Sequence, residues 1–299
     1  MSDFGLIYCV GATKAGTTRL YAALHDHPDC VTRMVKEAHY WDTFDAGQRS
    51  RQIAAYQIQV EDMRDRISRL QDEGRPFRAA KLAQRMGEMI DLIGVLDGNR
   101  KNDQAYLDWL TQDAGDRRVA ADFTPAYALL GDATYKRMLG LSPLTKVVFL
   151  LRDPLSRLWS HVRMHAGRYS KDSQELATRA NNTLSRILNN NEESHIVERG
   201  DYESIIVKLR RVVPDGQLFI GFAETVFGAE GWAQLCRFFG LPATGFDEDR
   251  RAYEGTPAQM RDALVPQAVT FLRNQYDWVA RNVGPLPREW QASLALAKG

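Results

Sequence analysis

The chain has 299 residues, of which 44% are hydrophobic and 26% charged, enough for one sizeable hydrophobic core. Its formal net charge of +1 gives no basis for nucleic acid or a strongly anionic surface as a partner. No apolar run approaches the length of a membrane span, and the first predicted strand starts too early to leave room for a signal peptide, so we expect a cytoplasmic protein without a membrane span.

The first predicted element is a short buried strand over residues 6–10, followed by a glycine-containing turn and a helix that begins at Thr17. A strand, a glycine loop and a helix start direct free backbone N–H groups and the helix dipole toward an anion, most often a phosphate. Lys14 adds a positive charge inside the loop. The candidate phosphate-binding residues are Lys14, Ala15, Gly16, Thr17, Thr18 and Arg19.

This loop differs from the ATP-binding loop G-x-x-x-x-G-K-[ST], in which the lysine directly follows the last glycine. Here Lys14 precedes Gly16, and Gly16 is followed by two threonines. The loop therefore has the style of a phosphate site without the ATP-binding pattern. The alternative is an ordinary glycine turn that carries a solvated lysine.

A reactive group of side chains follows the first helix and a short predicted strand over residues 30–33. Residues 36–42 read Lys-Glu-Ala-His-Tyr-Trp-Asp and combine carboxylates, an imidazole and two aromatic rings. Carboxylates and an imidazole close to a phosphate loop could form one wall of a reactive site, and Glu37, His39 and Asp42 are the candidates in this segment. The alternative is an amphipathic loop whose charges are solvated and whose aromatic rings only pack.

Residues 46–118 differ in composition from the rest of the chain, since charged and amide residues dominate and apolar residues recur at helical spacing. We expect two or three helices here, broken at residues 74–76 and 98–99. The segment is too charged for a central strand, so we interpret it as a helical insertion that covers one side of a sheet.

Two further strands each end in candidate functional residues. Residues 118–122 predict a strand that ends at Asp122, directly before Phe123. The apolar run from residue 146 predicts a central parallel strand buried on both faces, and it ends at Arg152. Pro154 suits the first turn of the next helix, which carries Ser160. An arginine at a strand end can make a bidentate phosphate contact.

The rest of the chain alternates helices and strands. Residues 170–199 are polar and predict a mobile excursion with one short helix, before a helix over 202–213 and a fifth strand over 217–222. A helix over 232–239 and a docking helix within 257–283 complete the prediction. The three cysteines, Cys9, Cys30 and Cys236, lack metal-ligand spacing, so we expect buried, reduced thiols.

Strands that alternate with helices, and that end in charged turns, indicate a doubly wound α/β fold with a central parallel sheet. We expect a single domain over residues 1–299, with the helical insertion within it. In this architecture the ligand binds at the carboxyl ends of the strands, where the candidate residues lie.

The order Thr-Lys-Ala-Gly-Thr-Thr, ahead of an apolar helix, resembles the 5′-phosphosulfate loop of the sulfotransferases that use 3′-phosphoadenosine 5′-phosphosulfate (PAPS). Residues 36–42 match a segment of the heparan-sulfate branch of that family, and the pattern Arg-Asp-Pro-x-x-Arg-x-x-Ser from Arg152 resembles its 3′-phosphate signature. The resemblance is to a P-loop-like sulfotransferase of bacterial type, and it is absent from residues 46–118.

This resemblance implies a sulfuryl transfer from PAPS to a hydroxyl or, as a second option, an amine, which leaves the product 3′-phosphoadenosine 5′-phosphate (PAP). It implies Glu37 as general base, assisted by Lys14 and His39, with no metal. Arg152 and Ser160 would hold the 3′-phosphate. His39, Asp42 and Phe123 would line the acceptor site, although relatives often carry a lysine where Phe123 stands.

Two other functions stay open from the residues alone. A P-loop kinase would use ATP, with Asp122 as a carboxylate for magnesium. A non-catalytic nucleotide-binding module would keep the donor site without turnover. For the acceptor, the resemblance implies a small molecule, a glycan or a lipid with a hydroxyl group, because family members serve many acceptors from one scaffold. The oligomeric state is not predicted.

Overall fold

Five parallel strands form the centre of the computed structural model, which describes residues 4–247 and 255–298. The strand order is β2-β3-β1-β4-β5, so the first strand lies in the middle of the sheet. The strands are β1 (Gly5–Gly11), β2 (Cys30–Thr32), β3 (Val119–Asp122), β4 (Lys146–Leu151) and β5 (Leu218–Phe222). The parallel sheet and all five predicted strands are confirmed.

The two central strands form the core because their side chains are apolar on both faces. Every residue of β1 is buried, and so is every residue of β4 after Lys146. The two strands pair directly, with Tyr8 opposite Val147 and Cys9 opposite Val148. Burial on both faces is the usual state of a central parallel strand with helices above and below it.

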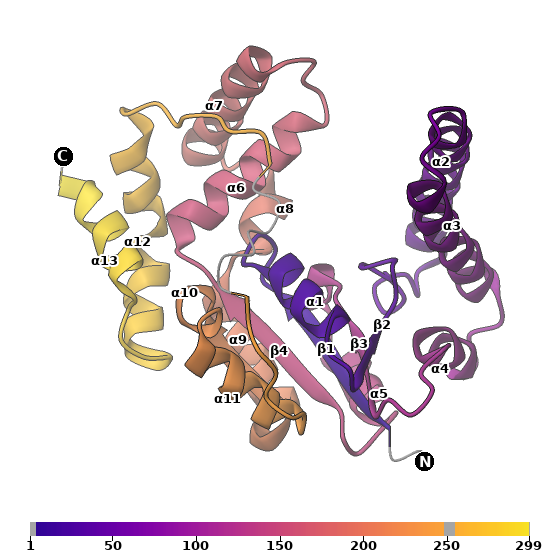
Figure 1. Cartoon of the computed structure of the whole chain (residues 1–299). Coiled ribbons are helices and arrows are strands. Elements are labelled where there is room, and N and C mark those ends of the chain that lie inside the picture. The colour runs from indigo at the N-terminus through magenta and orange to yellow at the C-terminus, as the bar shows by residue number, and fades with distance from the viewer. Residues whose placement is uncertain (1–3, 248–254, 299) are drawn as a thin grey trace.

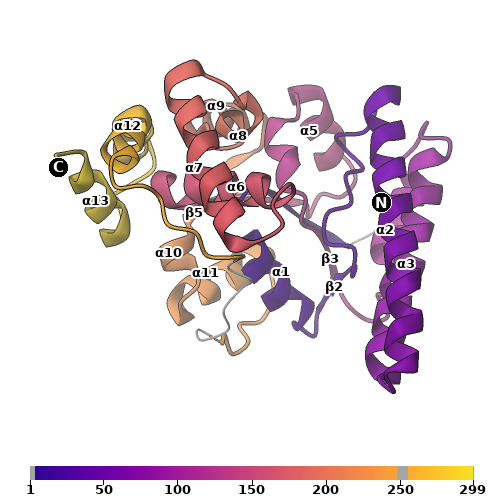
Figure 2. The same ribbon diagram turned by 90° about the horizontal axis from the view of Figure 1, so that it is seen from above.

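Helices cover both faces of the sheet (Figure 2). α1 (Thr17–His25) and α11 (Ala229–Phe239) lie on one face, and α5 (Asp132–Leu139) and α9 (Tyr202–Val212) lie on the other. Beyond the carboxyl ends of the strands lie α6 (Pro154–Gly167), α7 (Ser173–Asn190) and α8 (Ser194–Glu198). Three short elements flank the strands: η1 (Pro125–Leu129) follows β3, η2 (Asp215–Gln217) leads into β5, and α10 (Ala223–Val226) follows β5.

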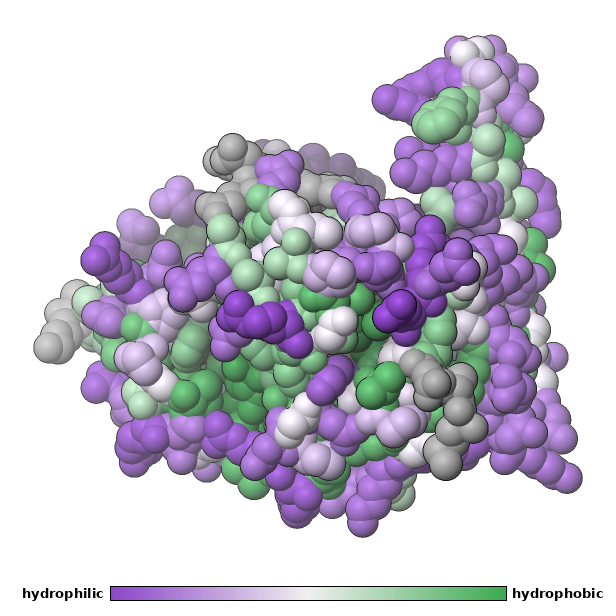
Figure 3. Space-filling model, turned by 60° about the horizontal axis from the view of Figure 1, so that its bottom comes forward, coloured by the Kyte–Doolittle hydropathy of each residue, from purple (hydrophilic) through white to green (hydrophobic). Residues whose placement is uncertain are grey.

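Residues 46–118 contain α2 (Ala46–Asp72), α3 (Pro76–Asp97) and α4 (Gln104–Thr111), with breaks where glycine and proline predicted them. α2 and α3 pack on each other and stand beyond the β2 edge of the sheet instead of lying over a face (Figure 1). They project from the body of the molecule with a largely hydrophilic surface (Figure 3). α4 is the helix of this group that packs against β2 and β3.

The expected mobile excursion over residues 170–199 is wrong, because most of it forms the 18-residue helix α7. Asp172 accepts a hydrogen bond from the backbone N–H of Glu175 at 2.8 Å and caps this helix. Its apolar residues are few but share one face, which packs on α6 and α12: Leu176, Ala180, Leu184 and Ile187. The prediction followed the polar composition of residues 170–199 and missed the helical spacing of these four apolar residues.

The C-terminal part consists of α12 (Leu264–Asn282), α13 (Arg288–Ala295) and η3 (Leu296–Lys298), and α12 packs against α6, α7 and α9. The predicted docking helix is confirmed as α12, whereas α13 was not predicted. Trp290 of α13 is fully buried between Tyr202 and Tyr276, with ring centroids 6.0 and 5.9 Å away. The three cysteines are buried and free, as expected. Within the described ranges, no helix combines the length and apolarity that a bilayer crossing needs.

Candidate functional site

The candidate site lies where the strand order reverses, between the carboxyl ends of β1 and β4. The chain leaves β1 toward β2 and β3 on one side, and later returns to build β4 and β5 on the other. Ligands of open parallel sheets bind in such a crevice. The structure brings both predicted phosphate motifs there, since the Nη1 atom of Arg152 donates to the backbone carbonyl of Lys14 at 3.2 Å.

The loop after β1 has the backbone geometry of an anion cradle. Gly16 lies in the left-handed region with φ 87°, and Lys14 also has a positive φ of 70°. A Cβ atom on Gly16 would come within 2.5 Å of the Phe227 ring, so glycine is needed there for conformation and for space. α1 then starts at Thr17 and presents its free N–H groups to the loop.

The loop carries excess positive charge. Burial lowers the pKa of the Lys14 ammonium below its ordinary value, and repulsion from Arg152, Lys36 and Arg163 lowers it further. A bound anion would offset this repulsion and raise the pKa of Lys14 again. The electrostatics of the loop therefore favour the binding of an anion.

The end of β4 is held rigidly by residues far along the chain. The Tyr202 hydroxyl donates to the Arg152 carbonyl at 2.6 Å, and it also lies 3.2 Å from the Arg152 backbone nitrogen. Asp153 caps α6 by accepting from the Ser156 N–H at 2.9 Å. Ser160 is buried on α6, on the helix that continues from this strand end.

A line of polar contacts joins the phosphate loop to the segment 36–42. The Lys36 ammonium donates to Thr17 Oγ1 at 3.1 Å and lies 3.5 Å from the Glu37 carboxylate. On its other side, Glu37 lies 3.5 Å from His39 Nε2, and His39 Nδ1 lies 2.8 Å from Asp42 Oδ2. The line of contacts therefore runs from the phosphate loop through Glu37 and His39 to Asp42.

Lys36 belongs to this line but is not among the site residues predicted from the sequence. Its place beside Glu37 in the matched segment was the available signal. A lysine that touches both a phosphate-loop threonine and the candidate base can stabilise negative charge between them.

Glu37 and His39 carry opposite charges in this arrangement. Burial alone would raise the pKa of Glu37, but hydrogen bonds and charge attraction from His39 and Lys36 lower it to about 2. Burial would likewise lower the pKa of His39, but its bonds to Asp42 and Glu37 raise it to about 9. At neutral pH the segment therefore presents an ionised carboxylate beside an imidazolium.

Three hydroxyl groups beneath this segment surround the buried carboxylate of Asp122. Thr124 donates to its Oδ1 at 2.6 Å, while Tyr106 and Tyr127 donate to its Oδ2 at 2.8 and 3.0 Å. Burial raises the pKa of Asp122 to about 6, although these hydroxyls act to lower it. Asp122 thus serves the core, and its donor-filled oxygens do not fit the magnesium ligand that a kinase would need there.

The same hydroxyl groups hold the backbone of the candidate catalytic segment. Thr124 Oγ1 accepts from the Ala38 N–H at 3.0 Å, and the Tyr127 hydroxyl accepts from the Tyr40 N–H at 2.9 Å. From α2, Tyr56 donates to the Glu37 carbonyl at 2.5 Å. The backbone on both sides of His39 is therefore fixed by buried hydroxyls.

A cavity of about 710 Å³ opens beside His39 and Asp42. The start of α2 forms one wall, and η1 with the start of α5 forms another. Two arginines in its lining, Arg51 and Arg199, have no ion-pair partner in the described part of the chain. A cavity of this size suits a small organic molecule.

The structure does not bring every candidate residue to this site. Phe123 is only 1% exposed and packs edge-on against Tyr21 in the core, so it does not line the cavity. The Arg19 guanidinium lies 4.9 Å from the centre of the Phe227 ring, the ring that also lies against Gly16 of the loop. Ala15 has no exposed side chain, so the loop backbone is what it can offer a ligand, and Thr18 is exposed on the first turn of α1.

Comparisons with known proteins agree with this geometry. Residues 7–245 match the Sulfotransferase family. The fold is similar to the crystal structure of a sulfotransferase from Alicyclobacillus acidocaldarius, with TM-score 0.58, 19% identity, and coverage of 95% of this chain and 98% of that one. A sulfotransferase domain from the curacin biosynthetic pathway aligns with TM-score 0.48, 15% identity, and coverage of 100% and 98%. A search of curated proteins found no match.

Proposed function

The chain belongs to the sulfotransferase family, and from this premise we propose that it transfers the sulfuryl group of PAPS to a hydroxyl group of a small acceptor. The observation that carries the proposal is the line of contacts from Thr17 through Lys36 and Glu37 to His39. It joins a positively charged phosphate loop to a carboxylate and then to a cavity. Donor, base and acceptor would thus meet in the order that an in-line transfer needs.

The donor would be held by its two phosphate ends. The N–H groups of the loop, Lys14 and Thr17 would bind the 5′-phosphosulfate end, where the loop charges repel one another in the free protein. Arg152 and Ser160 would bind the 3′-phosphate beyond the end of β4. Arg152 keeps its guanidinium near the loop by its bond to the Lys14 carbonyl.

Catalysis would rest on positioning and charge, because the sulfuryl group moves between two oxygens through a loosely bonded state, as in phosphoryl transfer. Lys14 and Lys36 would stabilise the charge that develops on the departing phosphate. Glu37 would accept the proton of the acceptor hydroxyl. A pKa of about 2 makes Glu37 a weak base that is ionised at neutral pH, which suits a proton that leaves late in the transfer.

The acceptor would occupy the cavity beside His39. Its lining includes the amides of Gln48 and Gln52 and the guanidinium groups of Arg51 and Arg199. These donors suit a polar acceptor with several oxygen atoms. We therefore propose a small hydroxylated molecule that also carries oxygens able to accept hydrogen bonds from these arginines.

The test of the donor is thermal unfolding with PAP, compared with ATP plus magnesium. A ligand that binds only the folded chain raises its melting temperature, so PAP should do so with a chelator present, and ATP with magnesium should not. Arg152→Ala should weaken PAP binding by about 1.5–3 kcal/mol, the scale of a charge-assisted hydrogen bond. The same substitution should weaken the binding of adenosine 5′-phosphosulfate much less, because this ligand lacks the 3′-phosphate.

Labelled PAPS with a panel of acceptors then tests turnover. Transfer to a hydroxylated acceptor supports the enzyme. PAP binding without transfer to any acceptor or water would favour a non-catalytic nucleotide-binding module. Stabilisation by magnesium ATP and not by PAP would contradict the proposed donor.

A further inference from the structure

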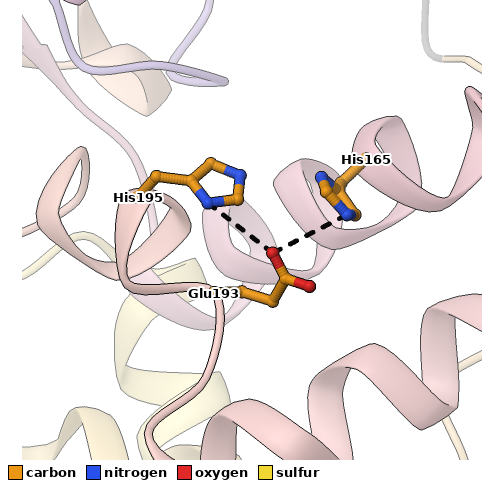
Figure 4. A group of neighbouring side chains, drawn as sticks. All are labelled: His165, Glu193 and His195. Atoms are coloured by element: carbon orange, nitrogen blue, oxygen red, sulfur yellow. Dashed lines mark ion pairs between the residues drawn. The ribbon is translucent and has the colours of Figure 1, made fainter.

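Three potential metal ligands converge away from the contact line that joins Thr17 to Asp42. His165 lies near the end of α6, His195 lies in α8, and Glu193 precedes α8. Both imidazole rings turn toward the same carboxylate oxygen (Figure 4). The three ligand atoms lie within 4.8 Å of one another.

The distances from Glu193 to the two histidines are longer than hydrogen bonds and close to those between two ligands of one metal ion. Oε2 of Glu193 lies 3.7 Å from His165 Nε2 and 3.6 Å from His195 Nδ1. Hydrogen bonds between such atoms are about 2.7–3.2 Å long. Ligands that each lie about 2.0–2.2 Å from a tetrahedral zinc ion are spaced at roughly 3.3–3.6 Å from one another, close to the distances seen here.

Within the described part of the chain, the two imidazole nitrogens and the carboxylate oxygen are free of hydrogen bonds that would compete with a metal ion for them. The Nδ1 atom of His165 is buried and has no hydrogen-bond partner among the described residues, so Nε2 is the nitrogen that faces Glu193. Arg186 approaches the other carboxylate oxygen of Glu193, Oε1, at 3.7 Å and leaves Oε2 to the histidines. The side chain of His195 is 49% exposed, which gives an ion access from solvent. The carboxylate of Glu193 would partly neutralise the charge of a bound ion.

We propose that His165, Glu193 and His195 form a binding site for one divalent transition-metal ion, with zinc as the best match. Two imidazoles and one carboxylate are a donor set that zinc accepts, with a water molecule as fourth ligand. The ion would fasten the end of α6 to the start of α8. α8 leads directly to Arg199, which lines the acceptor cavity, so the ion would also steady one wall of that cavity.

The experiment uses the full chain without an affinity tag, stripped by a chelator and titrated with zinc by calorimetry. We expect one zinc ion per chain. His195→Ala and Glu193→Gln should each weaken binding by at least about tenfold, since each removes one of three protein ligands. The matched control is His25→Ala, which removes a histidine bonded to Thr32 outside the cluster, and should leave zinc affinity unchanged.

Cobalt provides a readout that does not depend on calorimetry. Cobalt bound by nitrogen and oxygen ligands in tetrahedral geometry should give visible absorption bands without a thiolate charge-transfer band, and both ligand variants should lose them. Circular dichroism establishes that each variant is folded. A wild-type chain without zinc binding, equal affinity in all variants, or a thiolate band would each overturn the proposal.

Discussion

Glu37 and His39 set each other's charge at the junction between the phosphate loop and the cavity. The carboxylate is held ionised by His39 and Lys36, and the imidazole is held protonated by Asp42 and Glu37. Glu37 keeps nearly half of its side chain exposed, at 46%, so it remains accessible to an acceptor. The pair therefore combines a fixed orientation with an open approach.

Replacing Glu37 by Gln tests the general base directly. The amide keeps the size of the side chain but cannot take a proton, so turnover should fall by about 10²–10⁴, the usual contribution of a positioned base. PAP affinity should change by no more than a few-fold. Glu61→Gln, on the exposed surface of α2, is the matched control and should behave like wild type. Near-normal turnover in Glu37→Gln would show that another residue acts as the general base.

The raised pKa of His39 predicts a pH dependence of stability. A cation favoured by folding stabilises the protein fully below the ordinary pKa of 6.5, and this stabilisation is lost as pH rises through about 9. The Glu37 contribution runs the other way, since it is present above pH 4.5 and lost as pH falls through about 2. NMR titration of the His39 ring should give a midpoint near 9.

Asp42→Asn supplies the control for that titration. The asparagine keeps a hydrogen-bonding group beside His39 Nδ1 but removes the negative charge, so the midpoint should move down toward the ordinary histidine value. An unchanged midpoint in Asp42→Asn, or a wild-type midpoint near 6.5, would contradict the ion pair.

At the scale of elements, the stretch from Asp122 to Tyr127 acts as a support for the segment 36–42. It follows β3, which lies between β2 and the central strand β1, and its buried hydroxyls accept from the backbone of that segment. α2 adds Tyr56, and the loop after α3 adds Arg100, which donates to the Thr43 carbonyl at 2.8 Å. The helices of residues 46–118 therefore help to hold the candidate catalytic segment, beyond covering the sheet edge.

Thr124→Val tests this support. It leaves the Ala38 N–H and an oxygen of Asp122 without their partner, so the free energy of unfolding should fall by about 1–3 kcal/mol. Turnover should fall as well, because the backbone beside Glu37 is no longer fixed, whereas PAP affinity should hold. Chemical denaturation, turnover and PAP binding are the measurements.

The matched control is Thr145→Val, which also removes a buried hydroxyl. Thr145 donates to the Ser142 carbonyl at 2.8 Å, in the turn before β4. The Thr145→Val variant should be less stable than the wild type, but its turnover per folded molecule should be unchanged. If both variants lost turnover equally, the effect would be one of stability alone.

At the scale of the whole molecule, the C-terminal helices brace the end of β4. The Tyr276 hydroxyl of α12 donates to Asp153 Oδ1 at 2.6 Å, and Ser293 of α13 donates to its Oδ2 at 2.9 Å. Asp153 directly follows Arg152, the proposed 3′-phosphate ligand. Two residues that stand 123 and 140 positions further along the chain thus hold the side chain of Asp153, directly beside Arg152.

Tyr276→Phe tests this long-range support. It removes one of the donors to Asp153, so we expect a loss of about 1–2 kcal/mol in stability and a measurable loss of PAP affinity through Arg152. Tyr135→Phe is the control, because its hydroxyl is equally buried but bonds to the Tyr127 carbonyl, away from Asp153. PAP affinity equal in the two variants would show that α12 does not position the donor site.

The sequence alone determined the parts of this protein that depend on short stretches of chain. Apolar runs predicted five parallel strands, because a strand buried on both faces must be apolar throughout. The loop around Lys14 and the strand end at Arg152 were predicted from local spacing, and the doubly wound fold followed from their order. The family resemblance rested on these same stretches.

Only the tertiary structure decided which distant groups meet. It buried Phe123 in the core, filled the oxygens of Asp122 with hydroxyl donors, and placed Lys36 against Thr17. It also formed α7 from a polar stretch, because four apolar side chains suffice once neighbouring helices cover them. Contacts of this kind join residues far apart in the chain, and their geometry arises only when packing brings the elements together.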